Sequence, residues 1–151
     1  MKFFSVNNLS AGYGKHNILS NLSFAIDDSA TIGILGANGS GKTTLLKAIC
    51  GILPHNGTCQ LEDVILETKT PRQLARICSY IPQRSGISID ISVLDTVLMG
   101  FYSHLGFLEH PSVKMREKAI EMIHLVGLSG KEHTNYLHLS EGQKQLCILA
   151  R

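Results

Sequence analysis

Residues 36–44 read Gly36-Ala37-Asn38-Gly39-Ser40-Gly41-Lys42-Thr43-Thr44, and this glycine-rich segment is the strongest indication of the chain's fold class. It fits the pattern Gly-x-x-x-x-Gly-Lys-Ser/Thr, in which glycines let the backbone curl until several N–H groups point at one anion. A helix that begins near Gly41 adds the positive end of its dipole at the same point. Lys42 can reach the outer phosphates of a nucleotide, and Thr43 can offer its hydroxyl to Mg²⁺. The stretch therefore predicts a phosphate-binding loop; the alternative is a glycine-rich turn that binds nothing.

The flanking segments have the character that such a loop requires. Residues 31–35 form a continuous apolar run, which favours a strand buried on both faces. Residues 43–50 read as a helix that stops at Gly51. Elsewhere we expect strands over 3–9, 18–26 and 79–82, and an antiparallel pair or a meander within 57–66. Helices are expected over 70–77, 92–100, 112–126 and from 140 onward.

The composition is that of an ordinary globular domain. The chain has 151 residues, 44% of them hydrophobic and 17% charged, which suffices for one domain with its own core. A net charge of +2 gives no reason to expect a nucleic-acid partner. No apolar run is long enough to span a bilayer and no secretory signal is visible, so a cytoplasmic chain is expected.

Cysteine and histidine spacings predict no metal site. The four cysteines form no Cys-x-x-Cys pair, and we expect them to be small buried hydrophobic residues. The seven histidines show no His-Glu-x-x-His spacing, and solvated or locally bonded imidazoles are expected at His133 and His138.

A second helix start lies at Leu139-Ser140-Glu141-Gly142-Gln143. Taken alone, an ordinary capping box explains it as well as an anion site does. The segment nevertheless resembles the signature sequence Leu-Ser-Gly-Gly-Gln of the ATP-binding cassette (ABC) ATPases, with Glu141 in place of the first glycine. Residues 144–151 resemble the helix that follows the signature in that family.

Two more residues fit the same family in the right order. Tyr13, upstream of the loop, matches the aromatic residue that stacks on adenine; the alternative is a turn tyrosine packed on the sheet. Gln83 matches the glutamine that meets Mg²⁺ and the attacking water and relays to the membrane partner. Without the other motifs, a glutamine that follows a proline, as Gln83 does, would be interpreted as a solvated loop residue.

The resemblance covers essentially the whole chain and implies an α/β fold of the P-loop NTPase class, ABC ATPase type. It implies an N-terminal antiparallel β subdomain with the phosphate-loop core over about 1–85, a helical subdomain over about 86–138, and the signature with its helix over 139–151. The core would contain a parallel sheet whose C-terminal part is missing from these residues.

The resemblance also implies the site residues. ATP would contact Tyr13, Ser140, Gly142 and Gln143 and a loop set formed by Gly36, Asn38, Gly39, Ser40, Gly41, Lys42, Thr43 and Thr44. Thr43 and Gln83 would hold Mg²⁺, while Lys42 and Gln83 would be the catalytic residues. The family's strand ending in Asp-Glu, and its later histidine, have no counterpart after the signature in these residues. We therefore expect weak Mg-ATP binding without turnover, and an open sheet edge that lowers stability.

Within the family, residues 97–106 resemble importers of metal chelates such as iron siderophores, haem or cobalamin. The chain would then be the ATP-binding subunit, paired head to tail with a second copy and held by permease subunits at the inner face of the cell membrane. Leu105, Phe107 and Leu108 are candidate permease contacts, with domain core as the alternative. One other hypothesis is a nucleotide-binding module without turnover. Another is a soluble ABC ATPase of DNA repair or translation, but the long coiled-coil insert expected of such a protein does not occur between the two motifs of this sequence.

Overall fold

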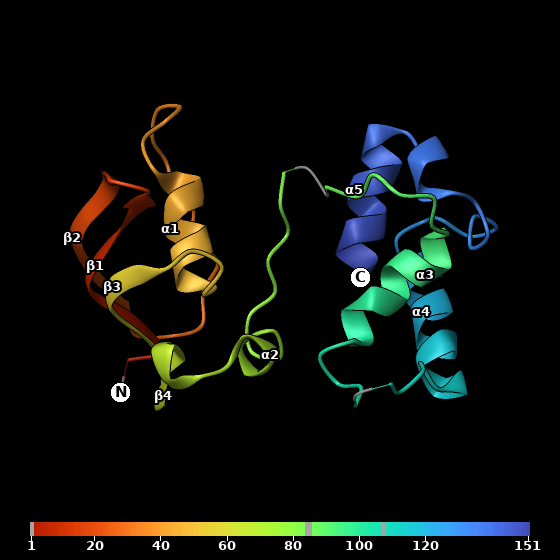
Figure 1. Cartoon of the computed structure of the whole chain (residues 1–151), viewed down its shortest axis with the longest axis horizontal. Helices are drawn as coiled ribbons and strands as arrows, with labels where there is room; N and C mark the ends of the chain where they lie inside the picture. Colours follow the sequence, from red (N-terminus) through yellow and green to blue (C-terminus); the bar gives the residue numbers. More distant parts are fainter. Residues whose placement is uncertain (1, 84–85, 107) are drawn as a thin grey trace. The chain divides into compact units, whose positions relative to one another are not determined.

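A four-stranded antiparallel sheet forms the basis of the first half of the chain (Figure 1). The computed structural model describes residues 2–83, 86–106 and 108–151, which divide into two units, Met1–Tyr80 and Ile81–Arg151. In the first unit the strand order is β2-β1-β3-β4. The bounds are β1 Phe4–Tyr13, β2 His16–Ile26, β3 His55–Leu61 and β4 Val64–Ile65. The strands expected over 3–9, 18–26 and within 57–66 are thus present.

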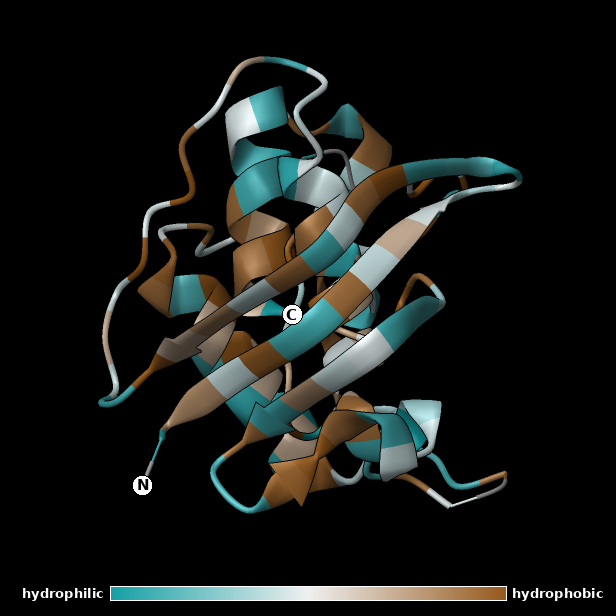
Figure 2. Cartoon of the chain, turned by 90° about the vertical axis from the view of Figure 1, so that its left-hand side faces the viewer, coloured by the Kyte–Doolittle hydropathy of each residue, from teal (hydrophilic) through white to brown (hydrophobic). Residues whose placement is uncertain are grey.

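The strands β1 and β2 form a tight hairpin in which Tyr13 pairs with His16. Figure 2 shows β1, β2 and β3 side by side, with hydrophobic and hydrophilic residues mixed along each strand. The helix α1, Lys42–Ile49, contributes Leu45 and Ala48 to the core of the unit. The buried apolar residues of this core are Val6, Leu9, Ala11, Leu45, Ala48, Cys59, Leu66 and Leu74.

The first unit ends in short elements. The 3₁₀ turn η1 spans Leu66–Thr68, and α2 spans Pro71–Leu74. Thr70 caps α2 with the expected box, because Gln73 N donates to its hydroxyl and Thr70 N donates back to the Gln73 side chain. The helix is shorter than the 70–77 predicted, and it continues only as turns.

Two predicted strands are wrong in this structure. Residues 31–35 have irregular backbone and are exposed, Leu35 by 96%, and residues 79–82 are also irregular. A strand needs neighbouring strands for its N–H and C=O groups, and no described strand pairs with either segment. All strand pairs within the described ranges are antiparallel, so these residues do not form the parallel sheet expected of the core.

The second unit is helical. It contains α3 (Val93–Leu98), η2 (Met99–Phe101), α4 (Val113–Leu125), η3 (Tyr136–His138) and α5 (Glu141–Ala150). Ser92, Ser112 and Ser140 cap α3, α4 and α5, each accepting a hydrogen bond from the backbone N–H three residues later. The predicted helix starts are therefore confirmed. A capping hydroxyl accepts a hydrogen bond from a backbone N–H only three residues away, so the local sequence is enough to predict it. In the part of the chain that the structure describes, no helix has the length and apolarity needed to cross a membrane.

Candidate functional site

Two glycines shape the backbone of the loop before α1. Gly39 and Gly41 have φ of 82° and 94°, values in the left-handed region that only glycine adopts readily. Gly41 is the N-cap of α1, and Ser40 N donates to the Ala37 carbonyl over 3.2 Å, which closes a tight turn. The first N–H groups of a helix have no acceptor within the helix, so those of α1 are available to an anion.

The Lys42 ammonium group lies within this loop. Its Nζ donates to the carbonyl oxygens of Gly36 and Ala37, each over 2.7 Å. A positive charge is therefore held among neutral acceptors at the place where the motif predicts phosphates. Phosphate oxygens would be stronger, charged acceptors for the same N–H groups.

The remaining loop residues differ in exposure. Asn38 and Ser40 are exposed, and a Cβ on Gly36 would lie 2.7 Å from Ser40 Oγ, so the loop is narrow there. The Thr43 side chain is exposed, while that of Thr44 is buried with 5% exposure. Thr43 can thus present a hydroxyl to a ligand, whereas Thr44 can offer only its backbone N–H.

Tyr13 lies at the end of β1, with 45% of its surface exposed. The ring lines a hollow of about 460 Å³ together with residues of β1, β2 and the segment leading into β3. Lys47 Nζ lies 6.0 Å from the ring centroid, at the outer limit of a cation–π contact. An ideal Cβ on Gly41 would lie 2.9 Å from Leu19 Cδ2 and 3.0 Å from Ile18 Cγ2, so the loop end contacts β2 of the same hairpin.

The other predicted site residues belong to the second unit. The Gln83 residue is exposed, and its carbonyl accepts a hydrogen bond from Gln145 Nε2 of α5 over 2.8 Å. Gln143 N donates to Ser140 Oγ over 3.3 Å, and Ser140 N donates to Gln143 Oε1 over 3.1 Å. The signature segment therefore does form the capping box that its sequence permits. Gly142 has no heavy atom within 4 Å of an ideal Cβ, so the backbone there is open.

The candidate permease contacts differ in burial. Leu105 is buried with 7% exposure, in agreement with the core alternative, whereas Leu108 is 83% exposed with φ of 64°. Phe107 lies outside the described residues. His133 and His138 are exposed, as expected.

The cysteines are free, and two of them are buried as predicted. Burial raises the pKa of the Cys147 thiol to about 11, although Arg151 opposes the shift slightly. Burial, and then the Glu67 carboxylate, raise the pKa of Cys59 to about 12. Cys50 and Cys78 are only partly buried. Nothing in the sequence spacing indicates that Cys59 lies against His55 and Glu67, because Glu67 belongs to a separate element, η1.

The fold of the whole chain is that of an ABC ATPase. A nucleotide-free ATP-binding cassette of an ABC transporter matches it with a TM-score of 0.80 at 24% identity, covering 99% of this chain and 64% of that one. An ABC transporter of the metal-chelate type, in an inward-facing conformation, matches with a TM-score of 0.74 at 27% identity, covering 99% and 55%.

The ABC transporter family model matches residues 19–151, and the chain belongs to this family. The "Probable iron chelatin transport ATP-binding protein" of Helicobacter pylori is 37% identical over 149 residues, which are 97% of this chain and 58% of that protein. The hemin import ATP-binding protein HmuV of Bordetella pertussis is 37% identical over 145 residues, 95% of this chain and 54% of HmuV. The chain thus spans little more than half the length of these relatives.

Proposed function

We propose that the chain is part of the ATP-binding subunit of an ABC importer, which couples ATP binding and hydrolysis to solute uptake. The observation that carries this proposal is the loop in which Gly41 starts α1 in a left-handed conformation and Lys42 Nζ lies 2.7 Å from two loop carbonyls. The relatives' names favour iron or another metal chelate as the solute, since iron chelatin and hemin occur among them.

ATP would bind with its phosphates on the N–H groups that open α1. In this proposal the contacts come from the loop set named above, with Lys42 as charge partner of the outer phosphates. Mg²⁺, when bound with ATP, would neutralise charge that develops on the phosphates. The exposed Thr43 hydroxyl and the Gln83 side-chain amide offer oxygen ligands of the kind that Mg²⁺ binds. We assign both residues as Mg²⁺ ligands. Lys42 and Gln83 remain the proposed catalytic residues.

A second subunit would complete the nucleotide site. We assign Ser140, Gly142 and Gln143 to contacts with ATP held by the loop of a head-to-tail partner copy. The open backbone at Gly142 supports close approach of a ligand, and Ser140 keeps a donor proton because its oxygen serves as acceptor in the cap.

The permease would contact the helical part of the chain at the inner face of the cell membrane. Exposed Leu108 is the remaining candidate contact among the described residues. The proposed division into a β subdomain with the phosphate-loop core (about 1–85), a helical subdomain (about 86–138) and the signature segment (139–151) is retained.

A test of the importer proposal is solute uptake in a cell that lacks the intact gene. Restoring the gene is expected to restore uptake of a radiolabelled iron chelate or of haem. A gene that carries Lys42→Ala should not restore uptake, because the variant binds ATP too weakly to support transport. Uptake that is unchanged by the deletion for iron chelates, haem and manganese would contradict the proposed role. A defect in DNA repair or translation would instead favour the soluble ABC ATPase.

Tyr13→Ala should weaken ATP binding by about 5- to 150-fold, because stacking a base on an aromatic ring contributes about 1–3 kcal/mol. Tyr13→Phe keeps the ring and should bind as the parent does. The measurement is titration of residues 1–151 with a fluorescent ATP analogue. Tyr102→Ala, which removes an exposed ring in the second unit, is the matched control. Equal affinities for Tyr13→Ala and the parent would mean that the ring is only structural.

A further inference from the structure

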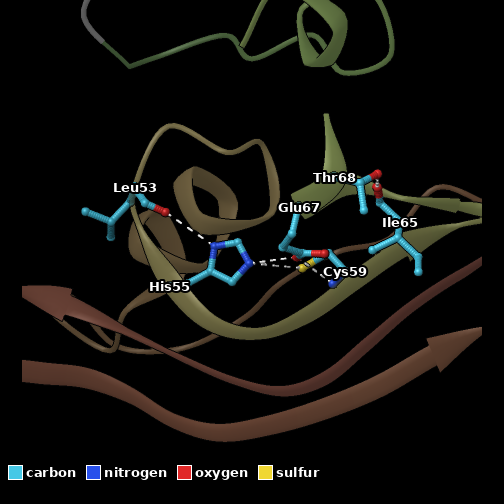
Figure 3. Close-up of polar contacts among 6 residues, drawn as sticks. All are labelled: Leu53, His55, Cys59, Ile65, Glu67 and Thr68. Atoms are coloured by element: carbon cyan, nitrogen blue, oxygen red, sulfur yellow. Dashed lines mark hydrogen bonds and ion pairs between the residues drawn. The ribbon is translucent and has the colours of Figure 1, made fainter. Parts of the chain in front are cut away.

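Three side chains with metal-binding atoms converge between β3 and η1 (Figure 3). His55 begins β3, Cys59 lies four residues along the same strand, and Glu67 is in η1. Residues four apart in a strand share a face, so His55 and Cys59 point to the same side. The three ligand atoms all lie within 4.8 Å of one another. His55 Nε2 is 2.9 Å from Glu67 Oε1 and 3.9 Å from Cys59 Sγ.

These separations suit a four-coordinate ion. Zinc binds histidine nitrogen and carboxylate oxygen at about 2.0–2.2 Å and cysteine sulfur at about 2.3 Å, so tetrahedral ligand atoms lie roughly 3.3–3.7 Å apart. The N···O separation of 2.9 Å is slightly shorter and the N···S separation of 3.9 Å slightly longer than this range. Small rotations of the His55 and Glu67 side chains would centre an ion among the three atoms.

The surroundings already orient the imidazole as a metal ligand. His55 Nδ1 lies 3.4 Å from the Leu53 carbonyl oxygen, and ligating histidines usually direct their second nitrogen at such an acceptor. A neutral ring that donates from Nδ1 leaves a lone pair on Nε2, which faces Glu67. The ion would then take the place of the proton that otherwise joins Nε2 to the carboxylate. Cys59 N donates to Glu67 Oε1 over 2.7 Å and holds that carboxylate in place.

The cluster is shielded on one side and accessible on the other. The side chain of His55 is 8% exposed and Cys59 is fully buried, while the side chain of Glu67 is 28% exposed. His55 and Glu67 also line a hollow of about 270 Å³ with Leu66, Lys69 and Leu74. An ion can therefore reach the site from this hollow, and water can supply a fourth ligand there, as in zinc sites with one open position.

We propose that His55, Cys59 and Glu67 bind a zinc-type divalent transition-metal ion that ties β3 to η1. A thiolate with an imidazole selects such ions over Mg²⁺ and Ca²⁺, which take oxygen ligands. Cys59 releases its proton to solvent on binding, so thiolate and carboxylate together balance the two charges of the ion. None of the three residues belongs to the phosphate loop, so the ion binds without ATP and is separate from any nucleotide-bound Mg²⁺.

Cobalt titration of residues 1–151 without nucleotide tests the site, since Co²⁺ replaces Zn²⁺ and is coloured. We expect a thiolate-to-cobalt charge-transfer band in the near ultraviolet and intense visible bands of tetrahedral Co²⁺, both abolished by one equivalent of Zn²⁺. Cys59→Ser should lose the charge-transfer band. Glu67→Gln keeps an acceptor for Cys59 N but removes the charge, and should bind at least about tenfold more weakly.

Two variants of the same unit serve as controls. Cys78→Ser and His16→Ala remove a thiol and an imidazole outside the cluster, and both should retain the parent's spectrum. Circular dichroism confirms that each variant is folded. If Cys59→Ser unfolds, the cobalt affinity of Glu67→Gln tests the site instead. Absence of the charge-transfer band in the parent, or a spectrum and affinity unchanged in Glu67→Gln, would show that the three residues form a hydrogen-bonded contact only.

Discussion

Replacing Lys42 by alanine should weaken ATP binding by about 10- to 150-fold. The ammonium lies 2.7 Å from two loop carbonyls, so its position is already set before a nucleotide arrives. Hydrogen bonds to charged groups contribute about 1.5–3 kcal/mol, and the phosphates would exchange neutral acceptors for charged ones. Calorimetric or fluorescence titration of residues 1–151 with ATP measures the effect.

The Lys42 comparison includes two further variants. Lys42→Met keeps the apolar stem and removes the charge, so it should lose as much affinity as the alanine variant. Lys118→Ala removes an exposed lysine that pairs with Glu121 on α4, and it should bind as the parent does. A folded Lys42→Ala protein with the parent's affinity would remove the basis for the nucleotide site.

A polypeptide of residues 1–151 should bind Mg-ATP without turning it over. Hydrolysis needs a carboxylate that accepts a proton from the attacking water, and such a base contributes about 10²- to 10⁴-fold to the rate. The single acidic residue after Leu139 in this sequence is Glu141. Its carboxylate pairs with Lys144 over 2.8 Å on the exposed surface of α5, so it is not a free base.

Steady-state phosphate release from purified residues 1–151 measures this turnover, and Lys42→Ala reveals contaminating activity. Release equal in the two proteins is the expected result. Release in the parent that disappears in the variant would mean that another residue acts as the base. The same assay can be repeated on a polypeptide that continues beyond residue 151. Turnover in that polypeptide would favour the importer ATPase, and its absence would favour the nucleotide-binding module.

Local patterns in the sequence predicted the helix starts and the loop well. Ser92, Ser112 and Ser140 each cap a helix in the structure, and α1 begins at Lys42 directly after the glycines. A cap or a left-handed glycine depends on atoms within a few residues, so the neighbouring sequence is enough to predict it. The family of the chain was likewise readable from the order of its motifs.

Turns, helix caps and the glycine-rich loop before α1 are thus predictable from short stretches of sequence. Tertiary structure alone decided that residues 31–35 are not a strand, because pairing depends on whether another strand lies beside them. It also decided that Glu67 meets His55 and Cys59, since the turn between β3 and β4 brings η1 back against β3. Contacts of this kind depend on how the backbone folds back on itself, and no spacing along the sequence records them.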